Sequence, residues 1–95
     1  MARTSVAFVD DHPVLLEGIG EIFRKKPEYL ILATGSTASD AVAIAQKNNP
    51  DVIVLDLNMP GDAFEAIRQI CEKTPQCRIV VFTAHPGIDY AVKAL

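Results

Sequence analysis

Three aspartates stand directly after short apolar segments, where buried strands would end. Asp10 and Asp11 follow residues 5–9, a segment rich in strand-forming residues, and Asp56 follows residues 52–55, which are apolar at every position. In open parallel sheets, ligands bind beyond the carboxyl ends of the strands, at the point where the strand order reverses. If these two strands are central neighbours, the three carboxylates converge in one shallow pocket.

Such a pocket has an electrostatic problem. Three carboxylates a few ångströms apart cannot all remain ionised without a counter-charge, because each one raises the pKa of the others. A hard divalent cation supplies that charge, and Mg²⁺ prefers oxygen ligands while it retains several waters. We therefore expect Mg²⁺ to bind at Asp10, Asp11 and Asp56. The alternative is a set of solvated strand-end or helix-cap carboxylates, which is the commoner role of any single aspartate.

The rest of the chain alternates short apolar segments with longer segments of helical periodicity. We expect strands at 5–9, 29–34, 52–55 and 78–83, and helices at 14–26, 37–48, 63–74 and 88–95. The second helix opens on Thr37-Ala38-Ser39-Asp40, which has the spacing of a capping box. Wholly apolar strands are typical of parallel sheets covered on both faces, and their crossovers are right-handed. The pattern predicts an α/β fold with a doubly wound open parallel sheet.

Helical spacing also predicts which side chains face the core. In the first helix these are Leu15, Leu16, Ile19, Ile22 and Phe23, and in the third they are Phe64, Ile67, Ile70 and Cys71. A hydrophobic share of 49% and a net charge of −3 argue against disorder and give no global indication of nucleic-acid binding. No segment has the roughly 20 apolar residues of a membrane span, and we expect a cytoplasmic protein with reduced cysteines.

The segments VDDHP, PDVIVLDLNMPG and VVFTA together resemble the receiver domain of two-component response regulators. The Asp-Asp-His-Pro segment, followed by Leu-Leu-Glu-Gly, is most similar to the LuxR/FixJ-type branch. The resemblance implies a flavodoxin-like sheet of strand order 2-1-3-4 and a single receiver domain over residues 1–95.

The resemblance also implies a role for the acidic residues. Asp56 is the implied phosphoacceptor, which takes a phosphoryl group from the phosphohistidine of a sensor histidine kinase. Asp11 and Asp56 are implied direct Mg²⁺ ligands, Asp10 a ligand through a water, and Asn58 a ligand through its backbone carbonyl.

The fourth expected strand carries further implied site residues. The Thr83 hydroxyl would donate a hydrogen bond to the phosphoryl oxygens, and the small Ala84 would keep the pocket open. Asn58 and His85, two positions after Asp56 and Thr83, are implied to tune the lifetime of the phosphorylated state. His12, a loop histidine beside a proline, we interpret as a structural hydrogen-bonding residue.

The chain departs from the family pattern near its C-terminus. Receivers normally continue into a fifth strand that ends in a lysine, followed by a fifth helix. We expect this chain to lack both, and Lys93 falls in the expected fourth helix, so it is no substitute. The loop PGDAFEAI is also shorter than the family pattern. An uncovered apolar edge at strand 78–83 would then favour self-association as a dimer or a swapped oligomer.

The expected function is a receiver that accepts phosphate on Asp56 and relays the signal to a DNA-binding output domain outside these residues. DNA would be bound through that output domain only, and chemistry would not go beyond self-phosphorylation and autodephosphorylation. One alternative is a phosphorylation-incompetent receiver fragment that acts as a protein-interaction or self-association module. Another is a small aspartate-dependent phosphatase, disfavoured because Asn58 stands where such enzymes often repeat an acid.

Overall fold

The computed structural model describes the backbone of residues 3–85 and 88–94 and the side chains of residues 3–81. The described elements are, in order, β1 (Thr4–Val9), α1 (Pro13–Arg24), β2 (Tyr29–Gly35), α2 (Ala38–Asn48), β3 (Val52–Asp56), α3 (Ala63–Lys73), β4 (Arg78–His85) and β5 (Ile88–Ala94). They form one sheet of order β2-β1-β3-β4-β5. Strands β1 to β4 are parallel, which confirms the expected doubly wound sheet and its 2-1-3-4 order.

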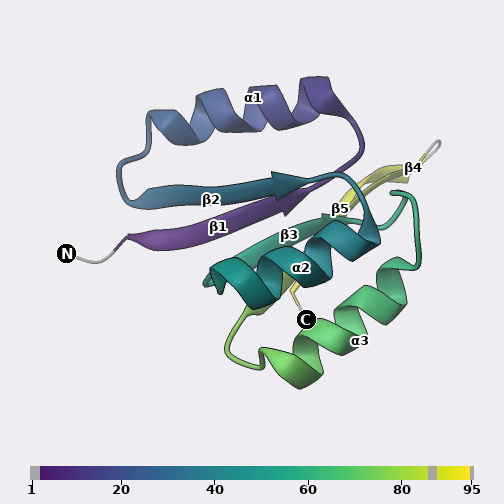
Figure 1. The fold of residues 1–95 in the computed structure, drawn as a ribbon. Helices are drawn as coiled ribbons and strands as arrows, with labels where there is room; N and C mark the ends of the chain where they lie inside the picture. The colour runs from purple at the N-terminus through teal and green to yellow at the C-terminus, as the bar shows by residue number, and fades with distance from the viewer. Residues whose placement is uncertain (1–2, 86–87, 95) are drawn as a thin grey trace.

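The sheet separates two helical layers, with α1 on one face and α2 and α3 on the other (Figure 1). The core lies under α2 and α3. Ile53 and Leu55 of the central β3 have no exposed surface, and the cluster around them includes Ala7, Val9, Ala41, Ile44, Ala45, Ala66, Ile70, Ile79 and Val81. Burial of each large aliphatic side chain contributes about 1.5–3 kcal/mol. This face therefore fixes the positions of the β1 and β3 strand ends.

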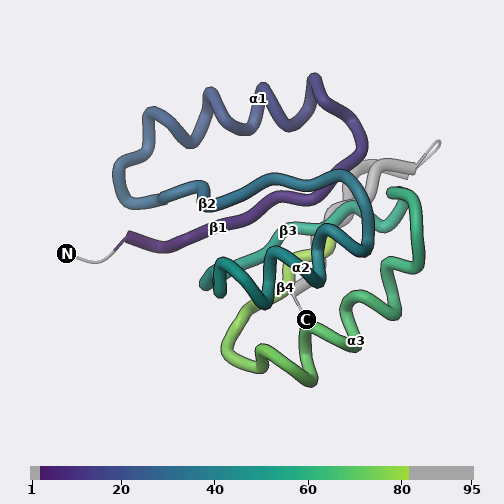
Figure 2. The backbone as a smooth tube through the Cα atoms, in the orientation of Figure 1, coloured from purple at the N-terminus to yellow at the C-terminus, as the bar shows by residue number. Residues whose placement is uncertain are grey.

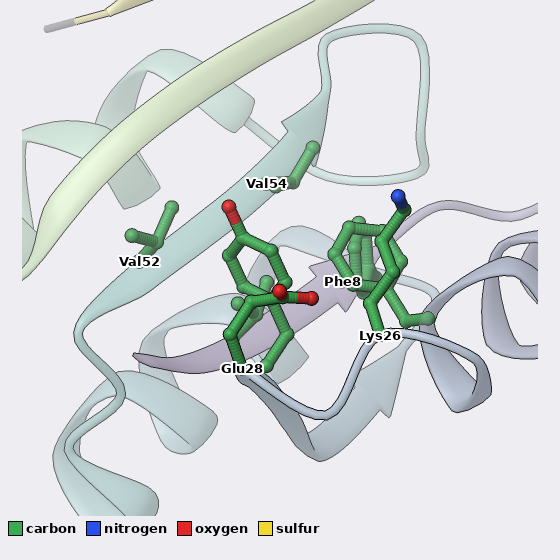
Figure 3. Close-up of a pocket in the computed structure, with 8 residues that line it drawn as sticks. Phe8, Lys26, Glu28, Val52 and Val54 are labelled. Carbon is green, nitrogen blue, oxygen red and sulfur yellow. The ribbon is translucent and has the colours of Figure 1, made fainter. Parts of the chain in front are cut away.

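The α1 face is packed much less closely. No residue of α1 is buried, and Ile22, expected in the core, is 57% exposed. A groove of about 590 Å³ lies on this face of the sheet beside the C-terminal end of α1, and Phe8, Val52 and Val54 line it (Figure 3). This groove lies near the amino ends of the strands, because Glu28 on its rim comes just before β2. No helix in the described part of the chain is long and apolar enough to cross a lipid bilayer.

Helix α3 packs through small residues. Ala63, Ala66 and Ile70 are buried, whereas Phe64 is 71% exposed and Cys71 is exposed. The expectation that Phe64 and Cys71 face the core was therefore wrong. Residues at spacings of three and four share one helix face, and on α3 the face that contains two alanines is the one that packs. Alanines let the helix lie close to its neighbours, so the larger Phe64 remains outside.

The segment 88–94 is a strand and not the expected helix. It pairs antiparallel with β4, with Val80 opposite Ala94 and Phe82 opposite Val92. The alternating Ile, Tyr and Val suit a strand, seven residues make at best a marginal helix, and the pairing covers the apolar edge of β4. Lys93 consequently lies in β5 opposite Val81. Because β5 occupies this edge of β4, two copies of the chain cannot pair there as expected. Self-association by another route stays a prediction.

The first turn of α2 carries the expected capping box. Thr37 Oγ1 accepts from the Asp40 amide at 3.1 Å, and Asp40 Oδ2 accepts from the Thr37 amide at 3.2 Å. The Ser36 amide also donates to Asp40 Oδ2, and this bond contributes most to holding the pKa of Asp40 below its usual value. These bonds satisfy amide donors that have no partner within the helix.

Replacing the cap residue will therefore destabilise the fold. We expect Thr37→Ala to lower the free energy of unfolding by about 1 kcal/mol, which corresponds to a fall of roughly 4–8 °C in the unfolding midpoint. Circular dichroism thermal scans measure this. Ser39→Ala, at an exposed position two residues later, is the matched control and should leave the midpoint nearly unchanged. Equal losses in the two variants would show that the cap contributes nothing specific.

Candidate functional site

The ends of β1 and β3 bring the acidic residues together. Val9 pairs with Leu55, so Asp10 and Asp56 follow as neighbours at the carboxyl edge of the sheet. The Asp10 amide donates to the Gly35 carbonyl at 3.0 Å, which extends the β1–β2 pairing up to this aspartate. The segments that leave β1 and β3 lie on the same side of the molecule (Figure 2). One ligand atom each from Asp10, Asp11, His12 and Asp56 lies within 4.8 Å of all the others.

Asp56 is one of the two buried carboxylates of this group. Only 5% of the residue is exposed, and its Oδ1 accepts from the Asn58 amide at 3.0 Å. Burial disfavours the ionised form and raises the pKa of Asp56 above its ordinary value. The nearby charges of Asp10 and Asp11 raise this pKa further, while the Asn58 amide and His12 oppose the shift. Asp56 therefore lies where a positive charge would be strongly favoured.

His12 enters the same cluster, a position that the sequence analysis did not foresee. Its Nδ1 lies 2.6 Å from Asp10 Oδ1, 3.1 Å from Asp11 Oδ1 and 3.8 Å from Asp56 Oδ2. The interpretation of His12 as a hydrogen-bonding residue is confirmed by the contact with Asp10. The sequence signal was its position two residues after Asp10, whose Oδ1 also accepts from the His12 amide at 2.9 Å.

The remaining predicted site residues lie at the same edge of the sheet. Asn58 is exposed, and its backbone N–H donates a hydrogen bond directly to Asp56. Asp56 pairs with Phe82, so the backbone of Thr83 comes one position beyond the level of Asp56 on the adjacent β4. Ala84 and His85 complete β4. The side chains of Thr83, Ala84 and His85 lie outside the part that the structure describes.

The donor atoms of the cluster are suited to a hard divalent cation. Three carboxylates from two strand ends offer the oxygen ligands that Mg²⁺ and Ca²⁺ prefer over nitrogen. Burial, and to a smaller extent the charges of Asp10 and Asp11, raise the pKa of Asp56, and a bound cation would favour its ionised form. The residues present therefore fit a magnesium site in their chemistry.

The contacts of His12 predict its titration in the metal-free chain. The hydrogen bond to Asp10, followed by the charges of Asp10 and Asp11, raises the pKa of His12 above 6.5. Its contribution to folding is complete below pH 6.5 and is lost as the pH rises through the higher folded-state pKa. NMR titration of the imidazole resonances measures this pKa directly. Asp10→Asn should move it back toward 6.5, and an unshifted His12 would contradict the observed contacts.

Comparison with known proteins identifies the family to which the chain belongs. The chain matches the response regulator receiver domain over residues 6–95. It is 32% identical over 94 residues to the transcriptional regulatory protein DegU of Brevibacillus brevis, covering 98% of this chain and 40% of that protein. It is 33% identical over 92 residues to the nitrate/nitrite response regulator NarL of Escherichia coli K12, covering 96% and 43%.

Solved structures agree with these matches. A LuxR-family two-component response regulator from Aurantimonas superposes with a TM-score of 0.80 at 33% identity, covering 88% of this chain and 61% of that one. The chain spans about two fifths of the length of the curated relatives it matches. The sheet order and the family match lead to one conclusion: this chain belongs to the response regulator receiver domain family, in the branch that contains LuxR- and NarL-type regulators.

Proposed function

We propose that this chain is a phosphoacceptor receiver in which Asp56 takes a phosphoryl group from a sensor histidine kinase in a Mg²⁺-dependent reaction. The observation that carries the proposal is the gathering of Asp10, Asp11 and Asp56 at two adjacent strand ends, with their oxygens within 4.8 Å. An interaction module that transfers no phosphate has no physical need for three crowded carboxylates, two of them buried.

The acidic residues divide the work between binding and reaction. Asp10, Asp11, Asp56 and the backbone carbonyl of Asn58 would hold Mg²⁺, which when bound neutralises charge on the phosphoryl oxygens. An Asp56 carboxylate oxygen attacks the phosphorus of a phosphohistidine, the bond from phosphorus to the imidazole nitrogen breaks, and the nitrogen keeps the electron pair. The product is an aspartyl phosphate. Such transfers depend on in-line positioning and neutralised oxygens more than on covalent help from other residues.

Residues of β4 would respond to the phosphorylation of Asp56. In this proposal the Thr83 hydroxyl donates a hydrogen bond to a phosphoryl oxygen, and Ala84 leaves room for the group. Asn58 and His85 would tune its lifetime. The added phosphate contributes negative charge and strong acceptors, which can shift the equilibrium between two surface states. The output would be a DNA-binding domain outside the present chain, and self-association remains part of the proposal.

Asp56→Asn should stabilise the metal-free fold. A carboxyl group whose folded pKa is raised, as that of Asp56 is, opposes folding once it ionises. The side-chain oxygen of the new asparagine can still accept the hydrogen bond from the backbone N–H of Asn58. We expect the unfolding midpoint at neutral pH, with a chelator, to rise relative to the wild-type chain.

With Mg²⁺ present, the wild-type chain should become more stable than Asp56→Asn. At 100 times its dissociation constant, Mg²⁺ adds about 2.7 kcal/mol to the wild-type stability, and Asp56→Asn should gain far less. Thermal scans with and without Mg²⁺ measure both effects. A wild-type midpoint that does not respond to Mg²⁺ would contradict the proposed site.

Phosphorylation itself is tested with acetyl phosphate and Mg²⁺. Intact-mass spectrometry should show one added phosphoryl group in the wild-type chain and none in Asp56→Asn. Asp51→Asn is the matched control, because Asp51 precedes the opposite end of β3, where it binds Ser5, and it should react like wild type. If beryllofluoride and acetyl phosphate produce no change that depends on Asp56, the fragment acts as an interaction module instead.

A further inference from the structure

The loop between β3 and α3 is attached to α2 at one point. The Ala38 amide, at the first residue of α2, donates to the Pro60 carbonyl at 3.0 Å. Thr37 and Asp40 cap other donors of this turn, so the loop supplies the acceptor for an amide that has none within the helix. Ala38 is 6% exposed, which protects this bond from water.

Gly61 brings the loop against the same alanine. Its φ is +97°, a conformation that residues with a Cβ rarely adopt. A Cβ built at Gly61 would lie 2.9 Å from the Ala38 Cβ, closer than real Cβ contacts allow. A side chain at position 61 therefore requires the loop or Ala38 to shift, and a larger side chain at position 38 would add atoms beside the same loop.

The same loop carries a candidate ligand group. Asn58 lies two residues before Pro60, and its amide binds Asp56 at 3.0 Å. Met59 is 4% exposed in the core, and at the far end the side chain of Asp62 accepts from the Glu65 amide at 3.0 Å. The short loop is thus held at both ends and in its middle, and the Ala38–Gly61 contact fixes its distance from α2.

We propose that Ala38 and Gly61 are positioning residues, whose contact sets the place of the Asn58 backbone beside Asp56 and so the affinity of the site for Mg²⁺. The metal part of this inference rests on the proposed function. Because the Ala38 amide donates to Pro60 in the same loop, Mg²⁺ binding should also shift the Ala38 amide resonance, although Ala38 contributes no ligand.

A double-mutant cycle isolates the contact from other effects of the substitutions. Gly61→Ala introduces both the Cβ contact and the φ strain, whereas combining it with Ala38→Gly removes the contact and leaves the strain. We expect Gly61→Ala to weaken Mg²⁺ binding by about tenfold or more, measured by calorimetry. In the Ala38→Gly background, adding Gly61→Ala should lower the Mg²⁺ affinity much less than it does in the wild-type chain. Additive effects would overturn the inference.

A second arm does not depend on Gly61 variants that fold. Ala38→Val enlarges the contact from the α2 side, and Ala43→Val, at an exposed position of α2, is the control with the same substitution in the same helix. Ala38→Val should weaken Mg²⁺ binding and shift the Asn58 amide resonance in the metal-free chain, whereas Ala43→Val should do neither. A loss of stability with unchanged Mg²⁺ affinity and an unchanged Asn58 resonance would make Ala38 merely structural.

The two proposals fail in different ways. A wild-type chain without Mg²⁺ affinity defeats the proposed function, yet the Asn58 resonance in the metal-free variants still tests the positioning contact. A wild-type chain that binds Mg²⁺, with Ala38→Val binding equally well, defeats only the positioning role.

Discussion

Crowded negative charge at the ends of β1 and β3 is the constraint on which the site depends. Asp10 and Asp56 are each 5% exposed, and burial, together with repulsion from Asp10 and Asp11, disfavours the ionised form of Asp56. The acids do not attract one another, so the backbone must hold them together. The register of β1 against β3 and the Gly35 carbonyl that accepts from Asp10 do so, and these bonds in turn depend on the core beneath α2 and α3.

The two faces of the sheet contribute unequally to this support. Under α2 and α3, the fully buried Ile53 and Leu55 anchor the strand that ends in Asp56. On the other face α1 buries none of its residues, and an apolar groove leaves Val52 and Val54 partly exposed. Local opening is easiest where few apolar contacts must be broken. Asp56, at the end of β3, is therefore held mainly from the α2–α3 side, whereas α1 packs more loosely on the other face.

The sequence predicted the parallel sheet and the acidic cluster because both depend on strong local patterns. Wholly apolar segments followed by aspartates specify buried parallel strands and their carboxyl ends. Phe64 and Ile22 were misplaced because helical periodicity shows that one face is apolar without showing which residues the neighbours leave room for. Residues 88–94 were misassigned because their pairing with β4 is a tertiary contact, and seven residues of mixed propensity do not decide between helix and strand.

His12 places a titratable ring nitrogen among the three acids. Its ring is mostly exposed, so solvent screens its attraction to the acids, yet its Nδ1 lies among all three carboxylates. An imidazolium and a divalent cation satisfy the same electrostatic need, but a carboxylate oxygen has a limited number of lone pairs. The more of them the ring engages, the fewer remain for a metal. Asp10 is the residue shared by both arrangements, because it binds His12 most closely and also borders Asp56. In the proposed magnesium site, Asp10 would therefore have to share its oxygens between the cation and His12.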